Sequence, residues 1–263
     1  MKYPKRGKKS HKGDNGTVLL IGGSKDFVGA AFLAGMSAFR TGVDLVLCAC
    51  PEKVAWSINC MSPDLITRKL KGSYLETKHV DKIDDLVAKA DVVLIGNGIS
   101  MKSAGFVKKL VKKLSLMGKK MVIDADAIKA IKLQDVKNAI ITPHEKEFKI
   151  LLKNSKLNSN NFVKKLGSNV LLLKSYEDKI YVNEKKGLKV YVNKTGNAGM
   201  SVGGTGDVLA GICAGLLAQT GNLKKSAKDG AKLTGKIGDV LFRIYRYGYT
   251  ASDFIDEIPA MMR

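Results

Sequence analysis

Apolar and polar positions along this chain fall into two kinds of block. Short runs such as Thr17–Gly22, Leu45–Cys50, Asp91–Gly96, Lys120–Asp124 and Ala139–Thr142 are almost wholly apolar. The stretches between them are longer and carry apolar residues at helical spacing. Uniformly apolar strands that alternate with helices are typical of a parallel sheet covered on both faces. We therefore predict a three-layer α/β/α protein with a mainly parallel central sheet.

The second half of the chain changes this pattern. Asn169–Lys174, Lys179–Asn183 and Leu188–Val192 lie close together with short turns between them, which predicts antiparallel strands at one edge of the sheet. Beyond residue 207 the pattern is helical to the end. Because no linker or low-complexity segment divides the chain, we expect one domain over residues 17–263, preceded by a basic leader over residues 1–16.

Hydropathy argues against a membrane protein. The longest apolar run, Val208–Ala218, is far shorter than the roughly 20 residues that a transmembrane helix needs. The basic N-terminus is not followed by the hydrophobic segment of a secretory signal. We expect a cytoplasmic protein that has no membrane partner.

The charge balance raises a hypothesis of nucleic-acid binding. The 263 residues include 45 Lys and Arg against 24 Asp and Glu, a formal net charge of +21. The lysines are spread along the chain, however, and Lys108, Lys109, Lys112 and Lys113 follow the spacing of one solvated helix face. Since no recognition motif for nucleic acid accompanies them, we consider nucleic acid an unlikely partner. Adaptation to salt or to anion-rich surroundings would give the same composition.

The most distinctive stretch is glycine-rich and ends in a carboxylate. Residues 196–207 read GNAGMSVGGTGD, with five glycines in twelve positions. Such a loop can wrap backbone N–H groups around an anion, and Asp207 would stand in the first turn of the helix that follows. Two interpretations remain open at this level: Asp207 caps the helix, or it does chemistry beside a bound phosphate.

Other polar and glycine residues also stand where predicted strands end. In an open α/β sheet this carboxyl edge is where ligands bind, so a pocket is expected there. Neither a P-loop nor a dinucleotide-binding fingerprint is present, since Met101 occupies the place of the third glycine after Gly96 and Gly98. The strand-end residues are Gly22–Ala30, Gly96–Gly98, Asp124–Asp126, Thr142–His144 and Lys174.

The segment from Asn197 to Gly211 closely resembles the signature of the ADP- or ATP-dependent NAD(P)H-hydrate dehydratases, repair enzymes with the ribokinase-like fold. Blocks in the same order along the chain carry the resemblance further. They are Gly22-Gly-Ser, Gly29-Ala30, Gly96-x-Gly98, Asp124-Ala-Asp-Ala127 and Thr142-Pro-His-x-x-Glu147. The resemblance implies removal of the hydroxyl group that hydration leaves on the reduced nicotinamide, at the expense of ADP or ATP with Mg²⁺.

The resemblance also implies roles for single residues. Asp207 would be the general base, and the backbone N–H groups of Gly204, Thr205 and Gly206 would stabilise the transferring phosphoryl group. The hydrated nicotinamide nucleotide would contact Ala30, Gly98, His144 and Asp207. The adenine nucleotide would contact Lys174, Ser175, Tyr176, Glu177, Asp178, Asn197 and Gly206. No firm metal ligand is predicted, although Asp124 and Glu147 are candidates to reach Mg²⁺ through water.

Three segments depart from the family pattern. Gly96–Ser100 lacks the usual proline, Glu145–Glu147 differs after the histidine, and Lys174–Asp178 places acidic side chains near the expected phosphates. The loop alone is also compatible with a ribokinase-like kinase of a thiazole or pyrimidine alcohol. By resemblance we expect a homo-oligomer, with a tetramer as one option, and a separate NAD(P)H-hydrate epimerase that works alongside this dehydratase.

Overall fold

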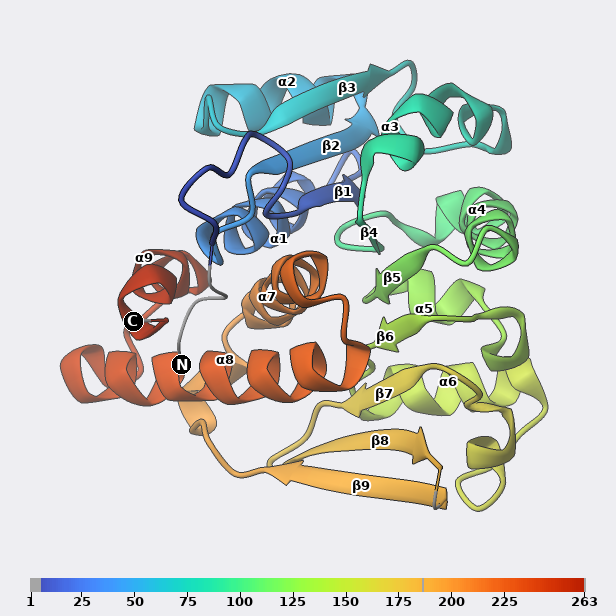
Figure 1. Cartoon of the computed structure of the whole chain (residues 1–263), viewed down its shortest axis with the longest axis vertical. Coiled ribbons are helices and arrows are strands. Elements are labelled where there is room, and N and C mark those ends of the chain that lie inside the picture. The colour runs from blue at the N-terminus through green and yellow to red at the C-terminus, as the bar shows by residue number, and fades with distance from the viewer. Residues whose placement is uncertain (1–5, 186, 263) are drawn as a thin grey trace.

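The structure is a computed structural model that describes residues 6–185 and 187–262, so the first five residues of the predicted leader lie outside it. Within these ranges, nine strands form one sheet in the order β3-β2-β1-β4-β5-β6-β7-β8-β9 (Figure 1). Strands β1 to β7 are parallel, and β8 and β9 are antiparallel. The strands are β1 (Thr17–Ile21), β2 (Leu45–Pro51), β3 (Ile66–Leu70), β4 (Val92–Ile95), β5 (Lys120–Ile123), β6 (Ala139–Ile141), β7 (Val170–Leu173), β8 (Asp178–Glu184) and β9 (Gly187–Asn193).

Helices cover both faces of this sheet, as the hydrophobic pattern predicts (Figure 1). One layer contains α1 (Val28–Arg40), α2 (Glu52–Met61), α7 (Thr205–Thr220), α8 (Leu223–Tyr245) and α9 (Ala251–Met261). The other contains α3 (Asp84–Lys89), α4 (Ala104–Leu116), α5 (Asp126–Ala130) and α6 (Glu145–Ser155). In the described part of the chain, no helix is long and apolar enough to cross a membrane.

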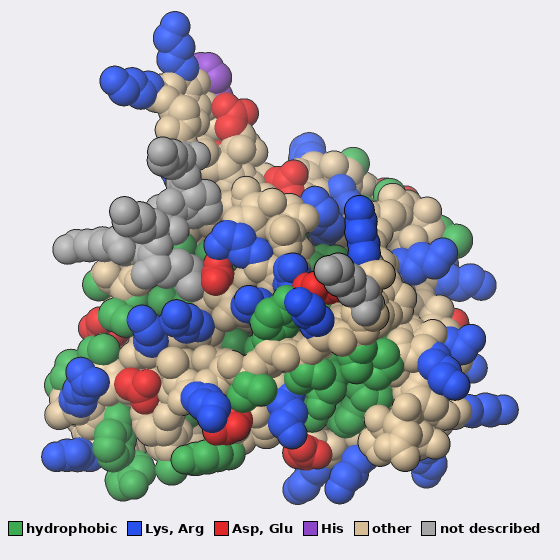
Figure 2. All heavy atoms as spheres, turned by 60° about the horizontal axis from the view of Figure 1, so that its bottom comes forward, with side chains coloured by type: hydrophobic (Ala, Val, Ile, Leu, Met, Phe, Trp, Pro, Cys, Tyr) green, Lys and Arg blue, Asp and Glu red, His purple; other side chains and the backbone are tan. Residues whose placement is uncertain are grey.

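Lysines and arginines are spread over the surface in the view of Figure 2. On the face drawn in Figure 2 they are scattered among neutral and acidic side chains. Lys108, Lys109 and Lys112 are exposed on α4, as expected for a solvated helix face. At the N-terminal end, Asp44 accepts hydrogen bonds from the backbone of Gly13 and Asn15, which holds the described part of the leader against the domain.

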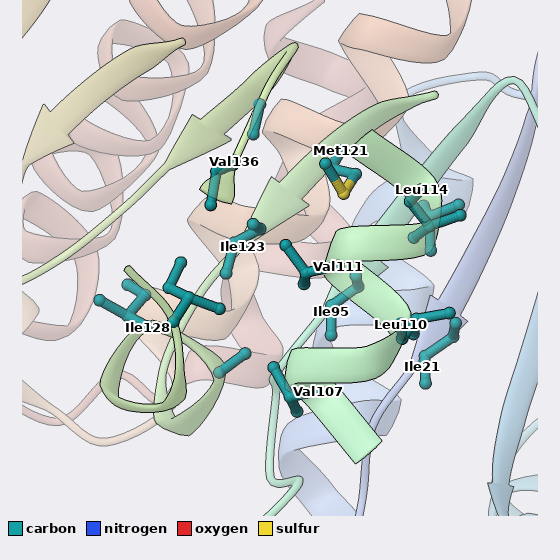
Figure 3. Packing of buried hydrophobic residues seen from close by; sticks show 14 of the residues in the cluster. Ile21, Ile95, Val107, Leu110, Val111, Leu114, Met121, Ile123, Ile128 and Val136 are labelled. Atoms are coloured by element: carbon teal, nitrogen blue, oxygen red, sulfur yellow. The ribbon is translucent and has the colours of Figure 1, made fainter. Parts of the chain in front are cut away.

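The core follows from the alternation of side chains along the buried strands. In β1, Leu19 and Ile21 face the layer of α3, α4, α5 and α6. Val18 and Leu20 face the opposite layer, which contains α1 and α7. Against the first layer, α4 packs a stripe of apolar side chains at helical spacing (Figure 3). The residues of this stripe are Val107, Leu110, Val111 and Leu114, which are at most 1% exposed.

Helix α7 is the most deeply buried helix near the predicted loop, with ten buried residues from Val208 to Leu217. It lies directly against α1. A Cβ atom at Gly211 would stand 2.2 Å from the carbonyl oxygen of Ala34, and one at Gly215 would stand 2.1 Å from Oγ1 of Thr41. The small residues of α1 therefore serve a contact inside the subunit, which fixes the start of α7 relative to β1.

Strand β3 is absent from our sequence-based prediction. Its residues Ile66–Leu70 read ITRKL, with three polar or basic residues in the middle, and only Leu70 is buried. As an edge strand it is not covered on both faces, so it lacks the uniformly apolar signal of its neighbours.

The strand order positions the site. Strands β1 and β4 are neighbours, and the chain continues from β1 toward β2 and from β4 toward β5, in opposite directions. Such a switch point opens a crevice at the carboxyl ends of the strands. Gly96, which directly follows β4, has φ of +126°, and a Cβ there would lie 1.9 Å from the carbonyl oxygen of Asp124. Glycine at this position lets the ends of β4 and β5 approach closely.

Candidate active site

The glycine-rich loop opens directly into the N-terminus of α7. Gly204 is the N-cap residue, with φ of +99°, and its carbonyl oxygen accepts the hydrogen bond of Val208 N–H. The N–H groups of Thr205, Gly206 and Asp207 therefore lie in the first turn, where an α-helix has no internal partners for them. The Thr205 hydroxyl donates to the carbonyl oxygens of Met200 and Val202 and closes the loop. The resulting turn can bind an anion through its backbone.

Asp207 does not cap this helix. No side-chain cap is formed at α7, and the Asp207 Oδ1 instead accepts a 2.7 Å hydrogen bond from Nδ2 of Asn97. Burial and the nearby Asp124 carboxylate raise the pKa of Asp207 to about 7, although Asn97 and Lys174 act in the opposite direction. The capping interpretation is therefore wrong, and Asp207 has the pKa of a group that exchanges protons near neutral pH.

Lys174 is the cation of the site. Its Nζ lies 2.8 Å from Oδ1 of Asp124, which also accepts a 2.7 Å hydrogen bond from the hydroxyl of Thr142. Burial lowers the pKa of Lys174, but the Asp124 and Glu147 carboxylates outweigh this effect and raise it. Lys174 is therefore fully charged at neutral pH. A Cβ at Gly206 would lie only 3.3 Å from the Lys174 Nζ, so the amine stands beside the anion-binding turn.

A cavity of about 630 Å³ adjoins the turn on the side of β8 and the loop before α7. It is large enough for a nucleotide. All seven residues predicted to contact the adenine nucleotide line it, namely Lys174, Ser175, Tyr176, Glu177, Asp178, Asn197 and Gly206. Tyr176 is 97% exposed and stands at the surface of the cavity.

The two acidic side chains of this segment have partners within the protein. Asp178 accepts hydrogen bonds from the backbone N–H of Ser175 and from Nδ2 of Asn193, and Glu177 forms an ion pair with Lys194. Burial raises the pKa of Asp178. These contacts shape the turn between β7 and β8.

Asn197 supports the loop through its side chain. Its Oδ1 accepts hydrogen bonds from Gly199 N–H and from the hydroxyl of Tyr249, and its Nδ2 donates to Asp239. Asp239 also accepts from the backbone of Gly196. Sequence reasoning missed Tyr249 and Asp239, because α8 and the segment after it carry no motif that marks them as partners of the loop.

Ala30, Gly98 and His144, three of the predicted substrate residues, are not part of the lining of that cavity. Gly98 has φ of +71°, and a Cβ there would lie 3.1 Å from the Cβ of Ala30 and 2.4 Å from the carbonyl oxygen of Phe27. Gly98 follows Asn97 directly, so Ala30 and Gly98 are brought to the same crevice as Asp207. His144 pairs with Lys174 in an isolated parallel bridge, which places it at the same sheet edge.

His144 is also the N-cap of α6. Its Nδ1 accepts hydrogen bonds from the backbone of Lys146 and Glu147, and its own N–H donates to the Glu147 carboxylate. The imidazole is half exposed, with the Nε2 lying 3.5 Å from the Glu147 Oε1. Capping and substrate contact are compatible, because the two functions use different nitrogen atoms.

The carboxylates do not form a protein cage for a metal. Among the described residues there is no group of three or more His, Cys, Asp and Glu side chains that could hold an ion. Both oxygens of Asp124 already accept hydrogen bonds, from Thr142 and Lys174 and from Asn97. Mg²⁺ commonly keeps several waters and is held largely by nucleotide phosphates. The donor set therefore fits an ion that arrives with a nucleotide.

The fold and this site define an α/β enzyme of the ribokinase-like class. A ribokinase-like superfamily protein from Enterococcus faecalis superposes with a TM-score of 0.82 at 25% identity, over 98% of this chain and 90% of that one. An ADP/ATP-dependent NAD(P)H-hydrate dehydratase from Bacillus subtilis, co-crystallised with ATP and Mg²⁺, superposes with a TM-score of 0.81 at 25% identity, over 98% and 92%.

Comparison of the sequence with known families identifies one family within this class. Residues 18–260 match the model of the NAD(P)H-hydrate dehydratase family, and the chain belongs to this family. It is 37% identical to the bifunctional NAD(P)H-hydrate repair enzyme Nnr of Methanothermobacter thermautotrophicus, over 100% of this chain and 52% of that protein. It is 34% identical to the ADP-dependent (S)-NAD(P)H-hydrate dehydratase of Nitrosopumilus maritimus, over 99% and 93%. The chain thus spans about half the length of its bifunctional relatives.

Proposed function

We propose that this protein dehydrates the S hydrate of NADH or NADPH back to the reduced cofactor, using ADP or ATP with Mg²⁺. The observation that carries the proposal is Asp207, which stands at an anion-binding helix turn with its pKa raised to about 7. Membership of the dehydratase family supports the same reaction. Residues 17–263 would act as one catalytic domain.

In the proposed reaction, Asp207 takes the proton of the substrate hydroxyl while that oxygen forms a bond to the terminal phosphorus of the nucleotide. The bond from phosphorus to the leaving AMP or ADP breaks, and the backbone N–H groups of Thr205 and Gly206 stabilise the charge on the transferring group. The phosphate ester then leaves as inorganic phosphate with the electrons of its bond to carbon. The neighbouring ring carbon loses a proton to solvent, and the electrons of that C–H bond form the ring double bond.

The other residues hold the two reactants. Lys174 and the cavity segment from Ser175 to Asp178 would bind the nucleotide, and Asn197 would keep the loop in shape. Ala30, Gly98 and His144 would contact the hydrated nicotinamide nucleotide. Mg²⁺ that arrives with the nucleotide would supply positive charge to the phosphates. Such neutralisation would offset the negative charge of the Asp124, Glu147 and Asp207 carboxylates, which interact with Lys174 at the site.

The partner proteins follow from the chemistry. A dehydratase that accepts one stereoisomer needs an epimerase to interconvert the two hydrates, so we expect such an activity beside this one. Self-association into a homo-oligomer, with a tetramer as one arrangement, is likewise a proposal that sedimentation of the purified protein tests. A cytoplasmic location fits the substrates.

An activity assay tests the proposal. Purified protein is incubated with hydrated NADH, Mg²⁺ and either ADP or ATP, and the absorbance of the reduced nicotinamide is followed together with phosphate release. We expect absorbance to recover with at least one nucleotide, one phosphate being released for each NADH formed. If neither nucleotide supports recovery, the proposal is wrong. Accumulation of a phosphorylated alcohol in place of NADH would identify a kinase.

A further inference from the structure

The side-chain amide of Asn97 lies between the carboxylates of Asp124 and Asp207, which belong to different sequence motifs. Its Nδ2 donates one hydrogen bond of 2.7 Å to Oδ1 of Asp207 and another of 3.1 Å to Oδ2 of Asp124. A primary amide nitrogen carries two hydrogens, so both are used. Asp124 follows β5 and Asp207 lies in α7, so one side chain from the end of β4 joins two different elements.

The position of Asn97 is fixed by its backbone. Asn97 is fully buried, and its carbonyl oxygen accepts a 2.8 Å hydrogen bond from Gly23 N–H at the end of β1. Gly96 and Gly98 on either side both have positive φ, and a Cβ at Gly22 would lie 2.4 Å from the Asn97 carbonyl oxygen. A side chain on such a constrained backbone can hold its partner in one geometry.

The Asn97 amide opposes the effect of nearby carboxylates on the pKa of Asp207. Asp124 and Glu147 carry the same charge as an ionised Asp207, and both raise its pKa. Lys174 and the amide of Asn97 act in the other direction. Lys174 makes its hydrogen bond to Asp124 and not to Asp207. Among the described residues, Asn97 is the side chain that donates a hydrogen bond directly to the Asp207 carboxylate.

We propose that Asn97 is the positioning residue of the base, which ties Asp207 to the Asp124–Lys174 pair and favours its ionised form. The Oδ2 atom of Asp207, to which no side chain in the described ranges donates, is left for the substrate hydroxyl. This inference rests on the proposed function only where it assigns Oδ2 of Asp207 to the proton of the substrate hydroxyl. The hydrogen bonds themselves make a claim about Asp207 that needs no substrate.

The experiment measures the titration of Asp207 in protein labelled with ¹³C in its aspartate carboxyl groups. The Asp207 signal is assigned from its absence in Asp207→Asn. Wild type is compared with Asn97→Ala and with Asn169→Ala. Asn169 is a matched control, because it is also buried and also makes two hydrogen bonds, to the backbone of Val136 and Ala139, but it precedes β7 at the opposite end of the sheet.

We expect Asp207 to titrate near 7 in wild type. In Asn97→Ala its pKa should rise by about one unit or more, since a hydrogen bond to the charged form is lost. Asn169→Ala should leave it unchanged although the protein is destabilised. The inference is overturned if Asn97→Ala titrates like wild type, or if both variants change alike. Should Asn97→Ala fail to fold, Asn97→Ser, whose short side chain cannot bridge the two carboxylates, takes its place with the same expected rise.

The pH dependence of turnover adds the catalytic half of the test. The acid limb of kcat should move to higher pH by the same amount as the pKa of Asp207 rises in Asn97→Ala. Below the wild-type midpoint, a pKa that is higher by about one lowers the ionised fraction of Asp207, and with it the rate, about tenfold. An unmoved acid limb would contradict a positioning role. If wild type itself shows no turnover, the proposed function fails while the titration still decides the role of Asn97.

Discussion

Asp207 lies where three other charged groups meet. Asp124 follows β5, Glu147 lies in the first turn of α6, and Lys174 follows β7. Together with burial, these three groups place the pKa of Asp207 near neutrality. A base whose pKa lies close to the working pH is both ionised often enough and basic enough to accept a proton. The environment of Asp207 therefore suits a role in proton transfer better than a role in a structural ion pair.

This raised pKa has a consequence for stability. In the unfolded chain Asp207 would titrate at its ordinary pKa of 3.8, whereas in the fold it titrates at about 7. The folded state therefore holds the proton more tightly, and the contribution of Asp207 to stability is lost as the pH rises from about 4 to about 7. Asp207→Asn removes this loss without changing the shape of the side chain.

We accordingly predict that Asp207→Asn is more stable than wild type at about pH 8, by roughly 2–4 kcal/mol. The difference should shrink toward zero near pH 4. Urea unfolding at several pH values measures it. A variant that is equally stable or less stable than wild type at the higher pH would contradict the raised pKa.

Single residues of the site differ in how far sequence reveals them. Asp207 and Lys174 are marked by motifs, because glycine-rich turns and strand ends have recognisable patterns. Asn97 is marked only as the residue between two glycines, since a bridge to Asp124 and Asp207 depends on how β4, β5 and α7 come together. Tyr249 is hidden for the same reason.

At the scale of elements, the contact of α1 with α7 sets the position of the loop. Both helices are rich in small residues, and Gly211 and Gly215 let the backbone of α7 approach α1 within the distance that a Cβ would occupy. Because Asp207 and Gly206 lie in the first turn of α7, this contact positions the anion-binding turn over the ends of β4 and β5.

Gly215→Ala tests this contact. Its Cβ would stand 2.1 Å from Oγ1 of Thr41 and 2.6 Å from the carbonyl oxygen of Ala38, so α7 has to move. We predict a loss of about 1–3 kcal/mol in the free energy of unfolding. Gly105→Ala in α4 is the control, because its nearest neighbour would be at an ordinary 3.6 Å, and it should change stability by less than about 1 kcal/mol. Equal effects of the two substitutions would show that α1 and α7 are not packed so closely.

Elements are predictable where burial is complete. The strands from β1 to β7, apart from β3, are buried on both faces and read as apolar runs, and the helical end of the chain is confirmed as α7, α8 and α9. Strand β3 escapes prediction because one edge of the sheet is open, so Ile66 and Arg68 on it are at least partly exposed. Its register against β2 is a tertiary property that the five residues do not encode.

At the scale of the whole molecule, the sequence carries a formal net charge of +21. On the face that Figure 2 shows, the basic side chains are dispersed. Dispersed charge attracts polyanions without selecting a sequence, and such attraction depends on counterion release.

We therefore predict weak binding of duplex DNA at low salt that is abolished at about 200 mM salt. Fluorescence anisotropy of a labelled duplex measures it, with a scrambled sequence and a single strand as comparisons. Tight binding that persists at the higher salt concentration, or that depends on sequence, would show that a nucleic acid is a specific partner.

The central claim is that Asp207 is the base of an NAD(P)H-hydrate dehydratase, and turnover by Asp207→Asn tests it most directly. The variant should bind nucleotide with wild-type affinity in calorimetry, since Lys174 and the cavity are unchanged. Its rate of NADH recovery from the hydrate should fall by a factor of about 10² or more. A variant that binds nucleotide normally and still restores NADH within about tenfold of the wild-type rate would contradict the claim.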